Sequence, residues 1–339
     1  MDNLTRRAFL ARVFLTSATL SLGSCRRTTR ESSEVVGDSR VPALVAVDPI
    51  AYLAERVGGE RAEVFALTPR GKDPETYAPT PGSLQAVVKT RLFFRVGLPI
   101  EERFARNIAS IAPDATSVDL TSSLDMLRDE HEHDHDREHE HEREHDREHD
   151  GDREPDLDRE PEREPEPERN RYDDEPLDAH VWTSPANARV MVATMADAFA
   201  NVDPEGEREY RASAEAFDAE LAALQDELRE RLAPYEGRSF VVFHPAYGYY
   251  AREFRLNQVA IEFEGKAPRP KQLQQLIERA RADGIKKLIV QPEFNRSSAD
   301  AIAKAIGGEV TTHSPLQKDY FANLRALTDA VVGSFSPLE

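Results

Sequence analysis

The sequence has a single cysteine, a modest share of apolar residues and a deficit of basic charge. With Cys25 as its only cysteine, the chain can form neither an intramolecular disulfide nor a cysteine-rich zinc finger. Lys and Arg number 44 against 63 Asp and Glu, a net charge of −19. This deficit argues against nucleic-acid binding, which needs a basic surface, and suits a cationic partner. The apolar fraction of 39% is low for a globular protein but too high for a fully disordered one.

The negative charge is concentrated in one stretch, residues 129–176. It holds 24 acidic residues and 8 arginines, a net charge of −16, which leaves −3 for the rest of the chain. Seven histidines alternate with these charges: His131, His133, His135, His139, His141, His145 and His149. Up to about Arg171 only Leu157 is apolar, so the stretch cannot bury a core and we expect a disordered insert. We expect it to bind divalent cations weakly and transiently; the alternative is a solvated charge run without a ligand.

The first 25 residues have the features of an export signal. A positive start at Arg6 and Arg7 precedes the uncharged stretch Val13–Cys25, which is too short for a membrane-spanning helix of about 20 residues. The order around the two arginines resembles a twin-arginine signal, and Leu22–Cys25 resembles a bacterial lipobox, in which the cysteine is lipidated. The alternative is a plain cleaved signal with a chance cysteine.

No other segment has the length and hydrophobicity of a membrane span. Residues 26–40 are polar and rich in Ser, Thr and Arg, as a tether would be. The sequence therefore predicts an extracytoplasmic protein, in the periplasm or at the cell surface, that is soluble apart from a lipid anchor at Cys25.

The body of the chain alternates strand-like apolar runs with helical patterns. The first series predicts strands at 43–47, 62–67, 92–96 and 116–120, with helices at 50–57, 83–89 and 101–110. The second series predicts strands at 240–243, 258–261, 287–290 and 309–312, with helices at 271–282, 298–306 and 320–332. This alternation predicts an α/β fold with helices on both faces of mostly parallel sheets. Two such series imply two lobes.

The region between the two series predicts one long helix. Residues 207–232 contain no Gly or Pro, and Phe217, Leu221, Leu224 and Leu228 form an apolar stripe. Such a helix is roughly 35–40 Å long, enough to join two lobes; the alternative is a surface helix within one lobe. We therefore divide the body into a lobe at 41–206, which contains the insert, a linking helix at 207–234 and a second lobe at 235–339.

Five residues of the body are candidate metal ligands. They are Glu75, His180, His244, Glu293 and His313. Each follows a predicted strand or precedes a helix start with a capping hydroxyl before proline, at Thr80 or Ser184. In open α/β sheets such loops line the crevice at the carboxyl ends of the strands. Two facing crevices would form one cleft with ligands from both lobes. Taken singly, each residue is more often a surface or capping group.

Several motifs in the same order resemble the metal-specific solute-binding proteins of ABC transporters, the zinc and manganese group. The matching segments are Gly71–Pro81, Asp178–Asn187, Phe243–Tyr249, Gln291–Phe294 and Ser314–Leu316. The similarity runs from about Val41 to Phe335, with the insert where zinc members carry a His-rich loop.

The resemblance implies two (β/α) lobes joined by a rigid long helix, with one metal ion between them. It assigns as ligands Glu75, where the family usually has His, together with His180 and His244. The fourth family ligand is an acid, and here that position is Ser314. His313 or Glu293 could replace it, or water could complete a site with three protein ligands.

The resemblance implies a monomeric, non-enzymatic receptor that captures Zn²⁺ and delivers it to an ABC permease and its ATPase. Two imidazoles and a carboxylate suit Zn²⁺, and the histidine-rich insert favours it, although Mn²⁺ and Fe²⁺ accept the same donors. A zinc hydrolase is an alternative of another class, but no HExxH-type pair is present. A third alternative is a metal-buffering or adhesive surface protein in which the insert is the active part.

Overall fold

The computed structural model describes residues 40–78, 87–128, 177–262, 270–282, 284–294 and 296–335. These residues belong to one compact unit that begins at Ser39. The predicted signal with Cys25, nearly all of the tether and the histidine-rich insert lie outside the described residues. Among the helices that are described, none combines the length and hydrophobicity that crossing a membrane requires.

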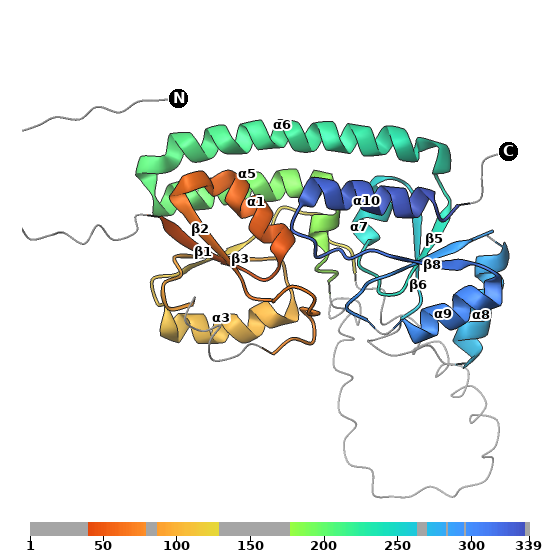
Figure 1. Cartoon of the computed structure of the whole chain (residues 1–339). Helices are drawn as coiled ribbons and strands as arrows, with labels where there is room; N and C mark the ends of the chain where they lie inside the picture. The colour runs from red at the N-terminus through yellow and green to blue at the C-terminus, as the bar shows by residue number, and fades with distance from the viewer. Residues whose placement is uncertain are drawn as a thin grey trace, which may run out of the picture. The chain divides into compact units, whose positions relative to one another are not determined.

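The first lobe is a parallel four-stranded sheet in the order β2-β1-β3-β4 (Figure 1). Its strands are β1 (Val41–Val45), β2 (Ala62–Ala66), β3 (Leu92–Arg95) and β4 (Thr116–Asp119). Helix α1 (Asp48–Gly58) connects the first two strands, and α3 (Pro99–Ile111) connects the last two. The buried strand β1 pairs Val41 with Ala62 on one side and Ala43 with Leu92 on the other.

The second lobe repeats this arrangement with the order β6-β5-β7-β8. Its strands are β5 (Ser239–Val242), β6 (Asn257–Ala260), β7 (Lys287–Val290) and β8 (Glu309–Thr312). Its helices are α7 (Gly248–Glu253), α8 (Pro270–Ala282), α9 (Ser297–Ile306) and α10 (Tyr320–Val332). In both lobes the second strand lies on one side of the first strand, and the third and fourth strands lie on its other side. Each sheet therefore has a topological switch point beside its first strand, and α/β proteins bind ligands at such points.

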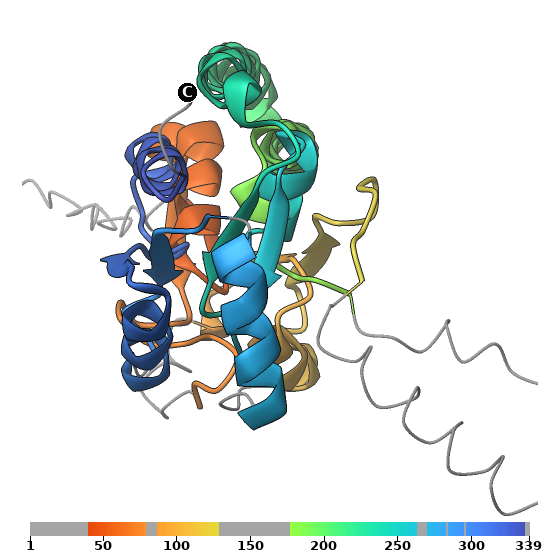
Figure 2. The same ribbon diagram turned by 90° about the vertical axis from the view of Figure 1, so that its right-hand side faces the viewer.

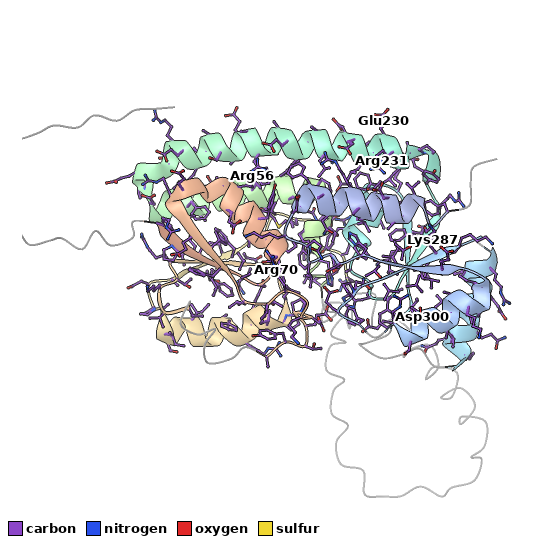
Figure 3. All side chains as sticks on the ribbon, viewed as in Figure 1. Arg56, Arg70, Glu230, Arg231, Lys287 and Asp300 are labelled. Carbon is purple, nitrogen blue, oxygen red and sulfur yellow. The ribbon has the colours of Figure 1, made fainter. Side chains whose placement is uncertain are left out.

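Two long helices lie between the two sheets in sequence, α5 (Pro185–Val202) and α6 (Glu207–Leu232). Helix α6 packs against α5, α1 and α10 and so contacts helices of both lobes (Figures 1 and 2). Its buried residues recur at helical spacing: Tyr210, Ala214, Phe217, Leu221, Leu224, Leu228 and Leu232. Ion pairs support this face, from Arg56 on α1 to Glu220 and from Arg231 to Asp329 on α10. Figure 3 labels the two arginines.

One cluster of buried apolar side chains extends through both lobes. It runs from the first sheet through α5 and α6 to Tyr250 and Leu327 of the second lobe. A separate cluster fills the space between the second sheet and the helices α8 and α9. The indole Nε1 of Trp182 also donates to the carbonyl oxygen of Pro315, at 3.0 Å. Because native cores are densely packed, this shared core opposes wide separation of the lobes.

The predicted two-lobed parallel α/β fold is confirmed. Ser184 caps α5 as its sequence predicted, accepting from the backbone N–H of Asn187 at 3.1 Å. Helix α7 was not predicted, because its six residues are too few to show a periodic pattern. Most of the helix predicted at 83–89 lies outside the described residues; residues 87 and 88 are helical.

Candidate metal centre

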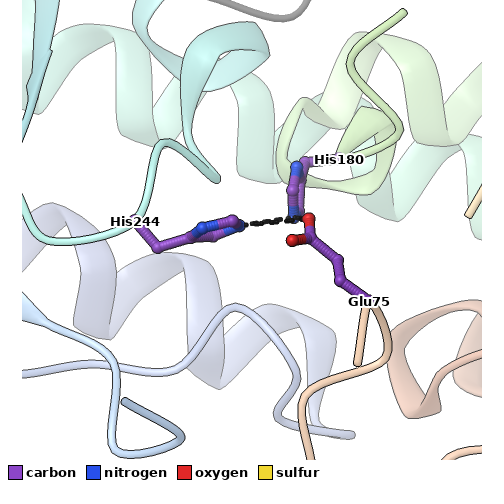
Figure 4. A group of neighbouring side chains, drawn as sticks. All are labelled: Glu75, His180 and His244. Carbon is purple, nitrogen blue, oxygen red and sulfur yellow. Dashed lines mark hydrogen bonds and ion pairs between the residues drawn. The ribbon is translucent and has the colours of Figure 1, made fainter. Parts of the chain in front are cut away.

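Three of the five candidate ligands meet in one cluster, Glu75, His180 and His244 (Figure 4). One donor atom from each residue lies within 4.8 Å of the other two. The Nε2 atoms of the two histidines are 3.4 Å apart. The Oε1 atom of Glu75 is 3.4 Å from Nε2 of His244 and 3.9 Å from Nε2 of His180. The donors therefore surround a space of atomic size.

Glu75 reaches the cluster from the turn that follows β2. Asp73 holds this turn, since its carboxylate accepts from the backbone N–H of Glu75 at 2.9 Å and from the hydroxyl of Thr76 at 2.7 Å. Arg103 of α3 donates to the carbonyl oxygens of Glu75 and Tyr77. The Glu75 side chain is 35% exposed, whereas both histidines are buried. The carboxylate therefore forms the solvent side of the cluster.

His180 lies directly before a single 3-10 turn, Val181–Thr183, which leads into α5. One oxygen of Asp178 interacts with both the backbone N–H and the ring Nδ1 of His180, each at 2.8 Å. Tyr249 of the second lobe donates its hydroxyl to the carbonyl oxygen of Asp178 at 2.7 Å. With Nδ1 engaged by the carboxylate, Nε2 is the nitrogen that faces the other two ligands.

His244 follows β5 at the switch point of the second sheet. The side-chain amide of Gln291, directly after β7, bonds to the backbone of His244 in both directions, at 3.1 and 2.7 Å. The carboxylate of Glu262, after β6, lies 3.3 Å from Nδ1. The ring stacks on Phe294 with centroids 4.9 Å apart. Residues that follow the two strands on either side of β5 thus hold this histidine.

The pKa of His244 reflects its buried, acidic surroundings. Burial by itself lowers the pKa, but the carboxylates of Glu262 and Glu75 more than offset it and raise the pKa to about 10. Without a metal ion the imidazole therefore carries a proton at neutral pH. A divalent cation that binds Nε2 replaces this proton, and the same two carboxylates then compensate the charge of the cation.

The spacing of the donors fits a small tetrahedral cation. Two ligand atoms, each about 2.1 Å from a tetrahedral ion such as Zn²⁺, are about 3.4 Å apart. The adjoining cavity measures about 20 Å³, roughly the space of one water molecule. Two imidazole nitrogens and one carboxylate oxygen form a typical three-ligand zinc set that leaves a fourth position open.

The other two candidates take different positions. His313 is buried away from the cluster, with Nδ1 2.9 Å from the hydroxyl of Tyr247 and Nε2 3.1 Å from the carbonyl oxygen of Asn323. Both ring nitrogens of His313 are thus engaged by neighbours outside the cluster, and its role as a ligand stays a prediction. Glu293 lines the cavity beside the two histidines but accepts a hydrogen bond from Ser314 at 2.7 Å. This bond engages Oε1 alone, and Glu293 lies beside the three clustered donors without being one of them.

The sequence reasoning missed the residues that support the two histidines, namely Asp178, Glu262 and Gln291. The signal for Glu262 and Gln291 was their place directly after predicted strands, which the parallel order then brings beside His244. The seven histidines of the insert, predicted as weak auxiliary ligands, and the predicted lipidation site Cys25 lie outside the described residues.

The chain is similar to several known proteins. The family described as zinc-uptake complex component A, periplasmic, matches residues 44–333. The high-affinity zinc uptake system protein ZnuA of Paracoccus denitrificans is 36% identical over 236 residues, 68% of this chain and 70% of that protein. The manganese-binding lipoprotein MntA of Halalkalibacterium halodurans is 24% identical over 269 residues, 76% of this chain and 74% of that protein.

A crystal structure of ZnuA is similar to this chain with a TM-score of 0.73 and 28% identity, covering 88% of this chain and all of that one. The family match extends over nearly the whole described body, through both lobes and all three clustered residues. This chain therefore belongs to the periplasmic component A family of zinc-uptake complexes, a zinc and manganese group of solute-binding proteins rather than enzymes.

Proposed function

We propose that this protein captures Zn²⁺ outside the cytoplasm through Glu75, His180 and His244 and delivers it to an ABC permease and its ATPase. The observation that carries the proposal is the pair of Nε2 atoms, 3.4 Å apart, with the Glu75 carboxylate beside them. Each imidazole is held by a carboxylate at Nδ1, an arrangement typical of histidines that bind metals.

The donor set favours zinc over manganese. Nitrogen donors and a small cavity suit a tetrahedral ion, whereas Mn²⁺ prefers more oxygen ligands around an octahedral site. Ser314 supplies no carboxylate where the family resemblance places an acid, so the open position falls to water or to Glu293. Relatives include both zinc and manganese proteins. The alternative to Zn²⁺ is therefore Mn²⁺ or Fe²⁺, and affinity measurements must distinguish these ions.

Capture needs little movement of the lobes. The buried histidines sit within the second lobe and the segment bonded to it, and the shared core opposes a wide hinge. Glu75 is the most exposed of the three, so the ion would enter and leave past its carboxylate.

We place the protein in the periplasm or at the cell surface as a monomer, exported by the twin-arginine signal and anchored by lipid at Cys25.

Metal affinity of the purified protein tests the proposal. The variant with both His180→Ala and His244→Ala should lose high-affinity Zn²⁺ binding in a competition titration against a chelating dye, while Mn²⁺ should bind the wild-type protein far more weakly than Zn²⁺. His313→Gln is the matched control, since it removes a buried imidazole outside the cluster and should keep zinc affinity. Unchanged zinc affinity in the double variant would refute the site, and tighter Mn²⁺ binding would refute zinc as the cargo.

A further inference from the structure

A buried carboxylate lies behind the second histidine of the cluster. Glu262 follows β6, is only 4% exposed, and its Oε2 atom is 3.3 Å from Nδ1 of His244. This nitrogen is on the opposite side of the ring from Nε2, which faces Glu75 and His180. Glu262 therefore contacts the imidazole without entering the space between the three clustered donors.

The fold removes this acid from contact with bulk water. A carboxylate removed from water needs a partner that compensates its charge. Within the part of the chain that the structure describes, the partner given to the Glu262 side chain is the imidazole of His244. A cation bound at Nε2 would strengthen this contact, because it makes the Nδ1–H a better donor.

The position of Glu262 is fixed by the sheet. Strands β5 and β6 pair in parallel with Val242 opposite Ala260, so residues 244 and 262 leave the sheet side by side. The backbone N–H of Glu262 also donates to the carbonyl oxygen of Phe243 at 2.9 Å. The main chain of this segment is thus tied directly to the residue before the histidine.

We propose that Glu262 is a positioning residue for metal binding: it accepts the Nδ1–H of His244 and so presents Nε2 as the lone-pair donor to the ion. Asp178 makes the corresponding contact with His180, at 2.8 Å, from within the same short segment of chain. The inference rests on the proposed function and adds a residue that determines how well that site binds. Loss of such an outer contact weakens metal binding by about 10–100-fold in comparable sites.

Two substitutions separate positioning from mere packing. Glu262→Ala removes the acceptor, and its Zn²⁺ affinity should fall by about 10–100-fold. Glu262→Gln keeps an oxygen that can accept from Nδ1–H, so it should recover most of that loss. Glu101→Gln is the matched control: it neutralises an equally buried acid in the first lobe and should leave zinc affinity unchanged.

The visible absorption of the Co²⁺-loaded protein gives a second readout, because it reports the number of nitrogen ligands. It should change in Glu262→Ala and keep the wild-type form in Glu262→Gln. The proposal is overturned if Glu262→Ala binds zinc like the wild type, or if Glu262→Gln is as weak as Glu262→Ala. If Glu262→Ala does not fold, Glu262→Gln still tests the proposal, because this variant must keep the cobalt spectrum and the zinc affinity of the wild type. Failure of the proposed function looks different: the wild type itself would then bind no single zinc ion through His180 and His244.

Discussion

At the scale of single residues, the proposed site would bind its ion in competition with a proton for one imidazole. His244 is buried between Glu75 and Glu262, which raise its pKa to about 10 against the effect of burial. The same two carboxylates that hold the proton also attract a dication. Affinity therefore depends on pH over a range in which a free histidine, with a pKa near 6.5, would already be neutral.

This competition predicts a pH dependence of zinc binding. Below pH about 10 each bound ion displaces one proton from His244, so apparent affinity should rise about tenfold per pH unit from pH 7 to about 8.5. Competition titrations across this range measure the slope, and calorimetry in buffers of different ionisation enthalpy counts the released proton. An affinity that is flat over this interval would show that His244 is neutral in the metal-free protein.

A second residue-scale prediction concerns Glu101, which lies outside the metal site. Its Oε2 atom accepts from the backbone N–H groups of Val96, Gly97 and Leu98 at 2.8–3.1 Å, while its buried Oε1 has no hydrogen-bond partner among the described residues. Burial raises the pKa of this carboxyl to about 7 despite those three donors. The folded state therefore holds the proton more tightly than the unfolded chain.

The sign of the effect on stability follows from this shift. The contribution of Glu101 is complete below pH about 4.5 and is lost as the pH rises through about 7, which amounts to roughly 3 kcal/mol. Glu101→Gln cannot ionise, so the stability of this variant should fall less between pH 5 and about 8 than that of the wild type. Urea unfolding of both proteins at the two pH values measures the difference. Equal pH dependence would mean that the carboxyl titrates normally.

The residues of the site were predictable only where chemistry and chain position coincided. Histidine and glutamate after strands or before helix starts pointed to Glu75, His180 and His244, but the same reasoning selected Glu293 and His313. What separates them is the tertiary contact of His313 with Tyr247 and Asn323, which no local pattern records. Glu262 was missed for the converse reason, since its importance comes from a neighbouring strand eighteen residues away in sequence.

At the scale of secondary-structure elements, α6 is the scaffold that contacts both lobes. Its buried residues keep a helical spacing along 26 residues, so the helix presents one continuous apolar face to α5, α1 and α10. Charged residues such as Glu230 cover the opposite face (Figure 3). Packing of this face, more than helix propensity, should stabilise the element.

Truncation of one side chain in this face tests the scaffold. Leu224 is 1% exposed, and Leu224→Ala should lower the free energy of unfolding by about 2–5 kcal/mol because it removes buried methyl groups and leaves a cavity. Glu230→Ala on the exposed face of the same helix is the control and should change stability by less than about 0.5 kcal/mol. Denaturant unfolding measures both variants; similar values would place the stabilising contacts elsewhere.

The strands were predictable from sequence to within one or two residues, because buried parallel strands are short apolar runs bounded by breaks. The strand predicted at 287–290 agrees with β7, and that predicted at 258–261 is shifted by one residue from β6. The strand order could not be predicted from these runs. The order depends on which strands the connecting helices bring together. It is the order β6-β5-β7 that places Glu262 and Gln291 on either side of His244.

At the scale of the whole molecule, the question is how the acidic insert relates to the folded body. The described residues that flank 129–176 are held together: Arg128 and Leu177 form an isolated antiparallel bridge, and the backbone N–H of Asp178 donates to the carbonyl oxygen of Leu127 at 2.9 Å. Tyr249 ties both ends to the second lobe through Leu127 and Asp178. The base of the insert is therefore part of the support of His180.

Because the ends already pair, the insert can be replaced by a two-residue Asn-Gly turn between Arg128 and Leu177, the usual connection of an antiparallel pair. The shortened protein should keep its zinc affinity within about threefold, since Asp178 and His180 retain their contacts. It should also lose the weak additional binding expected of seven histidines among carboxylates, so that calorimetry shows one ion per chain. Loss of the tight site on deletion, with the fold intact by circular dichroism, would instead make the insert the principal metal-binding element. Retention of tight binding together with loss of the weak sites would assign ion capture to the cluster of Glu75, His180 and His244, where Asp178 and Glu262 hold the two imidazoles.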